Sequence, residues 1–322
     1  MSGRKVLITG AAGFTGRHAV RYFHAAGAEV TAVVRRLPED PDIFAPEVAK
    51  YVCDLSDQGA VHAMIEAVRP EEVLHLAGRN SVPESWRDPL LYMETNVMAT
   101  LYLLEALRSQ PAGRILVAGS RLKYRPGAEE GPPHPYSLSK TLEELVSLAW
   151  GTLFKQPVLL AEPCNLIGPG PSTGFCSLLA RHIVRTETAE SEAELQPFRL
   201  SSRLAQRDFL DVRDAVRAYD VILRKGDTGV VYRIDSGAPH RLGDIAAELL
   251  AHTSAAVPMD WGPEDSSPDH DSAVSAVSGR EDTAYPAEHS AAVLGWKPEI
   301  PLVQSLADIL DHYRGAGKEG LV

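Results

Sequence analysis

The chain has 322 residues, a formal net charge of −11 and 44% hydrophobic residues. This length predicts one large domain with a smaller lobe. The acidic balance repels phosphate backbones, so we expect no nucleic-acid partner, and no apolar run is long enough for a membrane span. The three cysteines show neither a CxxC pair nor a metal-ligand spacing, and no secretion signal is visible. We therefore expect a reduced, cytoplasmic protein without a metal site.

Short apolar segments alternate with segments of helical periodicity along the first half of the chain. The predicted strands are Lys5–Thr9, Glu29–Val34, Val73–Leu76, Arg114–Ala118 and Pro157–Ala161, and the main predicted helices are Phe14–Ala26, Pro89–Arg108 and Ser137–Leu153. Strands that alternate with helices form a parallel sheet with right-handed crossovers. The pattern predicts an α/β fold of the Rossmann type, with a doubly wound parallel sheet.

The second half of the chain is less regular. Thr186–Glu194 is polar and acidic, which predicts a surface helix or loop. Trp261–Asp282 is rich in Ser, Asp, Pro and Gly, which predicts a long loop of the kind that is often functional. An amphipathic helix is expected near Pro301–Tyr313.

Three glycines, Gly10, Gly13 and Gly16, follow the first predicted strand and open the first predicted helix. Glycine permits a tight turn and a close approach of the backbone to a pyrophosphate, and the free N–H groups of the helix N-terminus attract its charge. We therefore predict a dinucleotide-binding loop that also includes Phe14 and Thr15. The alternative is a glycine-rich turn that serves packing alone.

The end of the second strand favours NADP(H) over NAD(H). An acidic residue there usually binds the ribose 2′-hydroxyl, but this chain has Arg35 and Arg36, and an arginine suits a 2′-phosphate. We predict Arg35 as the phosphate contact, against the alternative of two solvated arginines. Asp54 follows a further short strand, expected between Glu29–Val34 and Val73–Leu76, and either accepts a hydrogen bond from the adenine amino group or, like Ser56, caps the next helix.

A tyrosine and a lysine four residues apart, Tyr136 and Lys140, share one face of a predicted helix. The lysine charge, together with a positive nicotinamide, would lower the pKa of the tyrosine, which could then exchange a proton with a carbonyl or carbinol. Ser120 follows a strand end, where α/β sheets open their binding crevice, and could bind the same oxygen. A YxxxK pair alone is usually part of a surface helix. The upstream glycines and the serine favour catalysis.

The chain resembles the extended short-chain dehydrogenase/reductase family, in its nucleotide-sugar branch. The matching motifs, in family order, are GAAGFTG at 10–16, HLAG at 75–78, TNV at 95–97, GS at 119–120, YSLSK at 136–140, NLIGPG at 165–170, RDFLDVRD at 207–214 and LGWKP at 294–298. Within the branch it is most similar to the GDP-4-keto-6-deoxy-D-mannose reductases, above all in the stretches 75–86, 165–175 and 206–219.

The resemblance implies a role for individual residues. The catalytic residues would be Ser120, Tyr136 and Lys140. The cofactor would contact Gly10, Gly13, Phe14, Thr15, Gly16, Arg35, Asp54, Leu55, Leu76, Ala77, Asn96, Tyr136, Lys140 and Pro163. The substrate would contact Ser81, Asn165, Arg207 and Arg280. A guanidinium such as that of Arg207 can bind a diphosphate through two hydrogen bonds, although an ordinary ion pair with Asp208 or Asp211 is the alternative.

The chain departs from its relatives at three places. Related dehydratases carry an acidic pair just after the serine position, whereas this chain continues with Arg121, which argues against a dehydratase. The loop after Arg121 is short and basic before Tyr136, which predicts a different pocket mouth. The C-terminal region lacks the usual Arg-Pro-x-acid run, and Arg280 is the expected substitute.

These patterns together predict an NADPH-dependent reduction of a 4-keto-6-deoxy nucleotide sugar to the 6-deoxyhexose nucleotide. Residues 1–165, with parts of about 205–235, would bind the cofactor, and 166–322 would form mainly a smaller substrate-binding α/β lobe. The alternatives are an NAD-dependent nucleotide-sugar epimerase, a non-catalytic dinucleotide-binding regulator and a ketoreductase for another substrate. By analogy with relatives, Pro89–Arg108 and Ser137–Leu153 would pair in a homodimer.

Overall fold

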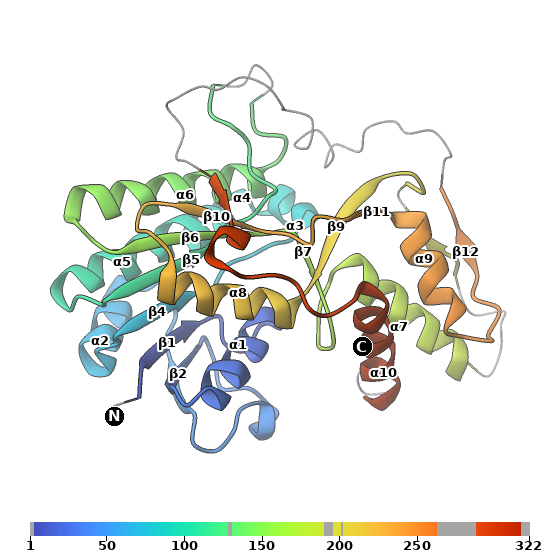
Figure 1. The fold of residues 1–322 in the computed structure, drawn as a ribbon, viewed down its shortest axis with the longest axis horizontal. Coiled ribbons are helices and arrows are strands. Elements are labelled where there is room, and N and C mark those ends of the chain that lie inside the picture. Colours follow the sequence, from blue (N-terminus) through green and yellow to red (C-terminus); the bar gives the residue numbers. More distant parts are fainter. Residues whose placement is uncertain (1–2, 128–130, 190–195, 201, 263–287, 317–322) are drawn as a thin grey trace. The chain divides into compact units, whose positions relative to one another are not determined.

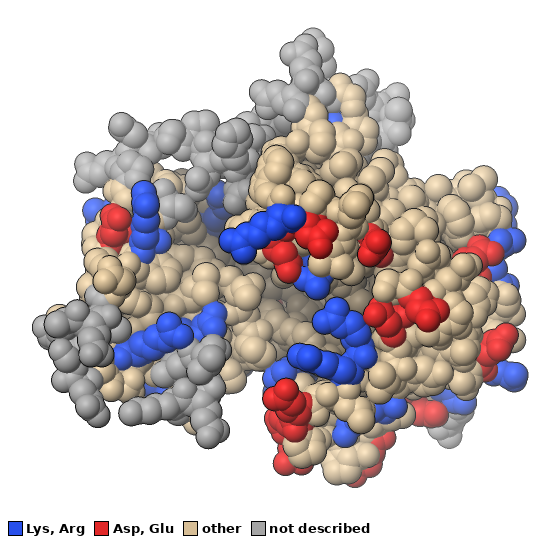
Figure 2. Space-filling model, turned by 180° about the vertical axis from the view of Figure 1, so that it is seen from behind, with Lys and Arg blue, Asp and Glu red and all other residues tan. Residues whose placement is uncertain are grey.

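The computed structural model describes residues 3–127, 131–189, 196–200, 202–262 and 288–316 (Figure 1). They divide into two compact units. The first comprises the described residues of Met1–Pro163, Val216–Ile234 and Val277–Trp296, and the second those of Cys164–Ala215, Asp235–Ala276 and Lys297–Val322. In the described part of the chain, no helix has the length and apolar character needed to span a membrane. Acidic and basic side chains lie interspersed on the face drawn in Figure 2.

A parallel sheet of eight strands forms the centre of the first unit, in the order β13-β10-β6-β5-β4-β1-β2-β3. The strands are β1 (Lys5–Thr9), β2 (Glu29–Val34), β3 (Ala49–Val52), β4 (Glu72–His75), β5 (Arg114–Ala118), β6 (Val158–Pro163), β10 (Val231–Ile234) and β13 (Glu288–Ser290). Within this sheet the strands from β3 to β6 follow the order 3-2-1-4-5-6, which is typical of a Rossmann fold. The order of the strands reverses between β1 and β4. The Rossmann-type sheet predicted from the sequence is therefore confirmed. Neither β10 nor β13 was among the predicted strands.

Helices cover both faces of this sheet (Figure 1). They are α1 (Phe14–Ala25), α2 (Gln58–Val68), α3 (Val82–Arg87), α4 (Pro89–Tyr92), α5 (Ala99–Ser109), α6 (Pro135–Phe154) and α8 (Val212–Lys225), which begins in the second unit. The helix predicted at Pro89–Arg108 is not a regular α-helix, because the π-helical turn Met93–Met98 separates α4 from α5. Such turns often occur at functional sites.

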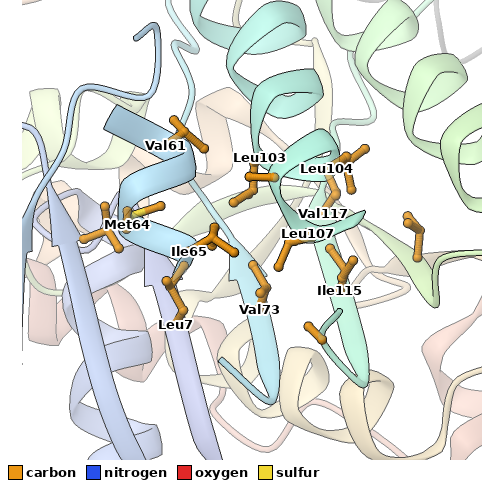
Figure 3. Close-up of a cluster of buried hydrophobic side chains, with 14 of the residues drawn as sticks. Leu7, Val61, Met64, Ile65, Val73, Leu103, Leu104, Leu107, Ile115 and Val117 are labelled. Atoms are coloured by element: carbon orange, nitrogen blue, oxygen red, sulfur yellow. The ribbon is translucent and has the colours of Figure 1, made fainter. Parts of the chain in front are cut away.

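One hydrophobic core cluster of the first unit lies between the sheet and the layer of α2 and α5. Leu7, Val73 and Ile115 project from the strands, and Met64, Ile65, Leu103 and Leu107 project from the helices toward them (Figure 3). All seven are at most 1% exposed. Strands of a parallel sheet that are buried on both faces have continuous runs of apolar residues in the sequence. For this reason the sequence predicted the strands more precisely than their connections.

The second unit contains two small sheets and three longer helices. Its strands are β7 (Asn165–Ile167), β9 (Gln206–Asp211) and β11 (Pro239–Arg241) in one sheet, and β8 (Phe198–Arg199) with β12 (Met259–Asp260) in the other. The helices α7 (Phe175–Thr188), α9 (Leu242–Ala251) and α10 (Leu302–Gly315) pack around one apolar core. The predicted segments Thr186–Glu194 and Trp261–Asp282 lie largely outside the described residues, as does Arg280.

Candidate active site

The glycine-rich turn after β1 leaves no room for a side chain at Gly10 or Gly16. Gly10 has a φ of +64°, and a Cβ there would come within 2.8 Å of the Ala77 backbone. A Cβ on Gly16 would lie 2.1 Å from the carbonyl oxygen of Gly10. Gly13 caps α1 without a side-chain hydrogen bond, so the N–H groups of the first turn, at Phe14 and Thr15, stay available to a ligand. A pyrophosphate fits this arrangement.

The same crowding places Leu76 and Ala77 beside the glycine turn. The hydroxyl oxygen of Thr9 accepts hydrogen bonds from both of their N–H groups, each at 3.1 Å. It also lies 2.7 Å from Nδ1 of His75. Burial lowers the pKa of His75 to about 3, so its ring is neutral at physiological pH. The carboxyl ends of β1 and β4 thus form one connected edge at the point where the strand order reverses.

Arg35 and Asp54 follow the ends of neighbouring strands. Both are exposed, and the charge of Arg35 assists two hydrogen bonds from Ser56 in lowering the pKa of Asp54. The helix-cap interpretation of Asp54 and Ser56 is wrong, because Asp57 caps α2 by accepting the N–H of Ala60 at 3.0 Å. Leu55 packs partly buried against the core.

Tyr136 and Lys140 lie on the first two turns of α6. His134 caps this helix by accepting the N–H of Ser137 at 2.9 Å, and Pro135 occupies its first turn. The ring of Tyr136 packs against His134 at 5.9 Å and edge-on against Tyr92 at 6.2 Å. These contacts fix the tyrosine hydroxyl relative to the sheet edge.

Ser120 hydrogen-bonds to Tyr136, and its oxygen also accepts the N–H of Leu122 at 3.0 Å. The structure therefore brings the three predicted catalytic side chains together. The predicted lowering of the tyrosine pKa, which also relied on a positive nicotinamide, is confirmed for the effect of Lys140. Burial raises the pKa of Tyr136, and Lys140 and Ser120 offset only part of that rise.

Lys140 is buried, yet its charge is well compensated. Its Nζ donates to the carbonyl of Ala118 at 2.9 Å and contacts the carboxylate of Glu143. Burial disfavours the ammonium, but Glu143 and Tyr136 outweigh this effect, and the pKa of Lys140 is raised. Sequence reasoning missed Glu143, although its position three residues after Lys140 placed it on the same helix face.

Asn96 and Ser81 are both engaged with the protein's own backbone. The amide of Asn96 accepts the N–H of Arg79 at 2.7 Å and donates to Ser139 at 2.9 Å. The hydroxyl of Ser81 caps α3 by accepting the N–H of Glu84. Pro163 ends β6 in the first unit.

Two predicted substrate residues lie in the second unit. Asn165 on β7 donates to the Asp208 carbonyl of β9 at 2.9 Å, and Arg207 on β9 donates to the Gln206 carbonyl at 2.9 Å. They occupy adjacent strands, because Asn165 pairs in register with Phe209.

The model of the NAD dependent epimerase/dehydratase family matches residues 6–235. Across 98% of this chain and 99% of the relative, the chain is 31% identical to GDP-6-deoxy-D-mannose reductase from Pseudomonas aeruginosa. It is 26% identical to dTDP-L-rhamnose 4-epimerase from Burkholderia thailandensis, over 96% of this chain and 94% of the relative. The solved structure of RMD from Pseudomonas aeruginosa complexed with NADPH superposes with a TM-score of 0.73 at 28% identity, covering 97% of this chain and 99% of that one.

Proposed function

This chain belongs to the NAD-dependent epimerase/dehydratase family, and on that premise we propose that it reduces a 4-keto-6-deoxy nucleotide sugar, of the GDP-4-keto-6-deoxymannose type, to the 6-deoxyhexose nucleotide with NADPH. The observation that carries this proposal is the arrangement of Ser120, half-buried, with the buried Tyr136 and Lys140 at the carboxyl edge of the sheet. The similarity to a GDP-6-deoxy-D-mannose reductase over nearly the whole chain supports the substrate class.

In this reaction the protein's residues would handle the proton. Tyr136 would donate its hydroxyl proton to the carbonyl oxygen at sugar C4, as a general acid. Ser120, already hydrogen-bonded to Tyr136, would donate to the same oxygen and orient it. Lys140 would stabilise the tyrosinate left behind, because its ammonium lies fixed beside it by Ala118 and Glu143. The nicotinamide cofactor, when bound, supplies the hydride.

The residues at the glycine turn fit a dinucleotide, because Gly10 and Gly16 allow the backbone to pack closely while the N–H groups at the start of α1 have no side-chain cap. We propose that Arg35 selects NADPH by binding its 2′-phosphate, since no carboxylate ends β2. Asn165 and Arg207 are proposed to bind the sugar nucleotide, with Arg207 at the diphosphate. We assign cofactor binding to the first unit and substrate binding mainly to the second.

We also propose a homodimer formed through α4, the π-helical turn, α5 and α6. Large apolar side chains are exposed on these elements, among them Leu90 at 73% and Leu153 at 67%. A partner copy packed on these elements would cover these side chains. Light scattering after size-exclusion chromatography would measure twice the chain mass, and a monomer at micromolar concentration would contradict this proposal.

The test of the function is a titration of the purified protein with NADPH and NADH, followed by GDP, UDP and dTDP on the NADPH complex. Preference for NADPH and GDP, and consumption of NADPH with GDP-4-keto-6-deoxymannose, would support the reductase. The epimerase alternative is favoured by the similarity to a dTDP-L-rhamnose 4-epimerase. NAD that stays bound through dialysis would identify that alternative, because an epimerase recycles its cofactor.

A further inference from the structure

A buried lysine links the three segments that carry the proposed catalytic residues. Lys123 lies three residues after Ser120, and its Nζ is 2.8 Å from Oε2 of Glu144 on α6. The same Nζ contacts the carboxylate of Glu162 on β6, just before Pro163. Glu144 is one helical turn beyond Lys140. One ammonium therefore joins the serine loop, the tyrosine helix and the strand that ends at Pro163.

Burial makes this link strong. The side chains of Lys123, Glu144 and Glu162 are 12%, 1% and 3% exposed. Removing one partner of a buried ion cluster leaves an uncompensated charge in a medium of low polarity, which is strongly unfavourable. The cluster therefore restricts the loop to one position more tightly than surface ion pairs could.

The loop is attached to α6 at a second point beside Lys123. The hydroxyl of Thr141 on α6 accepts a hydrogen bond from the N–H of Tyr124 at 3.0 Å. The same hydroxyl lies 3.1 Å from the carbonyl oxygen of Tyr124, to which it can donate. At the other end of the loop, the oxygen of Ser120 accepts the N–H of Leu122. That bond uses one acceptor site of the serine oxygen, so its O–H proton stays available to Tyr136 or, with substrate bound, to the carbonyl oxygen.

We propose that Lys123, through Glu144 and Glu162, is a positioning residue that sets the distance between the Ser120 and Tyr136 hydroxyls. This inference rests on the proposed function only in assigning the chemistry of those two hydroxyls. The basic segment Arg121–Arg125 thus contributes at least one of its charges to the interior.

The charges of the cluster provide a matched control. Lys123 and Lys140 face three carboxylates, those of Glu143, Glu144 and Glu162. Two cations balance two anions, so the third carboxyl group is most stable with a proton. Glu162→Gln imitates that protonated group with nearly the same shape, and it should leave the serine in place. Lys123→Met keeps the length of the side chain but removes the charge that joins the segments.

The experiment compares the wild-type protein with Lys123→Met, Glu162→Gln and the charge-exchanged double variant Lys123→Glu/Glu162→Lys. We measure kcat and KM with GDP-4-keto-6-deoxymannose, the Kd for NADPH by fluorescence, and the Ser120 Oγ to Tyr136 Oη distance in crystal structures. Misplacement by about 1 Å can cost about 100-fold in rate. We therefore expect Lys123→Met to lose about 10- to 100-fold in kcat, with the NADPH Kd within about twofold of wild type.

The double variant should recover most of that loss, and Glu162→Gln, whose amide oxygen can still accept from the Lys123 ammonium, should lose less kcat at pH 7 than Lys123→Met. Lys123→Met with unchanged kcat and an unchanged Ser120–Tyr136 distance would overturn the proposal. A parallel loss of NADPH binding and of thermal stability in Lys123→Met, without recovery in the double variant, would also overturn it, because that pattern indicates structural damage alone. If the wild-type protein binds NADPH but reduces no nucleotide sugar, the proposed function is wrong. The positioning role of Lys123 is then decided by whether the Ser120 Oγ to Tyr136 Oη distance changes in the crystal structure of Lys123→Met.

Discussion

The ammonium of Lys140 and the carboxylate of Glu143 form an ion pair inside the first unit, with side chains that are 7% and 1% exposed. Oε2 of Glu143 contacts the ammonium of Lys140, and Oε1 accepts a hydrogen bond from the hydroxyl of Thr100. The lysine that the mechanism needs as a cation is therefore fixed in that state by its own helix.

Glu143→Gln should weaken both stability and alkaline activity. Breaking a buried ion pair costs about 3–5 kcal/mol, so the free energy of unfolding in urea should fall by roughly that amount. Because Glu143 raises the pKa of Lys140, its loss lowers that pKa, and the alkaline limb of the kcat profile should move to lower pH. A variant with wild-type stability and an unmoved pH profile would contradict this role.

Tyr136→Phe tests the proton donor. Removing a general acid costs about 100- to 10,000-fold, so kcat should fall within that range. The ring contacts with His134 and Tyr92 persist in phenylalanine, so NADPH binding should change little. Tyr102→Phe, on α5 and away from these contacts, is the control. Retention of more than a tenth of kcat by Tyr136→Phe would remove Tyr136 from the mechanism.

Arg35→Ala tests the cofactor preference. Loss of a charge-assisted phosphate contact costs about 1.5–3 kcal/mol, which corresponds to a rise of about 10- to 100-fold in the NADPH Kd. The NADH Kd should stay unchanged, because NADH lacks the 2′-phosphate. Arg36→Ala is the matched control, since Arg36 is also exposed and directly adjacent. Equal changes in the Kd values for NADPH and NADH would show that Arg35 does not bind the 2′-phosphate.

Gly16→Ala tests the glycine turn. The added Cβ would lie 2.1 Å from the Gly10 carbonyl, so the turn must open or the variant must unfold. We expect loss of NADPH binding by titration calorimetry, with a lower melting temperature. In Gly59→Ala the nearest atom is Oδ1 of Asp57 at 3.4 Å, an ordinary contact. That control should bind NADPH normally and, as a helix position, lose no stability.

Glu162→Gln tests the proton in the buried cluster. Burial, opposed by Lys123 and reinforced by Glu144, raises the pKa of Glu162 to about 8. Between the unfolded pKa of about 4.3 and this value the folded protein binds more protons than the unfolded chain, so this group's contribution to stability falls as pH rises. The contribution is largest below the unfolded pKa and is lost as pH rises to about 8.

The charged groups that face Glu162 are Lys123 of the serine loop and Glu144 of α6. Lys140 and Glu143 lie just before Glu144 on the same helix. Urea unfolding from pH 5 to pH 8 should show a steeper loss of stability with pH in the wild-type protein than in Glu162→Gln. Parallel curves would mean that Glu162 is already ionised in the folded protein at pH 5.

The sequence by itself determined the sheet and the kind of chemistry. The strands predicted at Lys5–Thr9, Glu29–Val34 and Arg114–Ala118 are confirmed at those bounds, because strands buried on both faces leave unbroken apolar runs. The proximity of Tyr136 and Lys140 could also be predicted from the sequence, because residues four apart on a helix lie on the same face whatever the fold.

Only the tertiary structure decided how charge is distributed around that chemistry. Glu162 is 39 residues from Lys123 in the sequence, and no local pattern indicates that a lysine in a basic segment turns inward to meet it. The sign of the Tyr136 pKa shift likewise depends on burial, which outweighs the neighbouring lysine. Ion pairs and desolvation are set by distances in space and by exclusion of water, and both arise only when the strands and helices pack together.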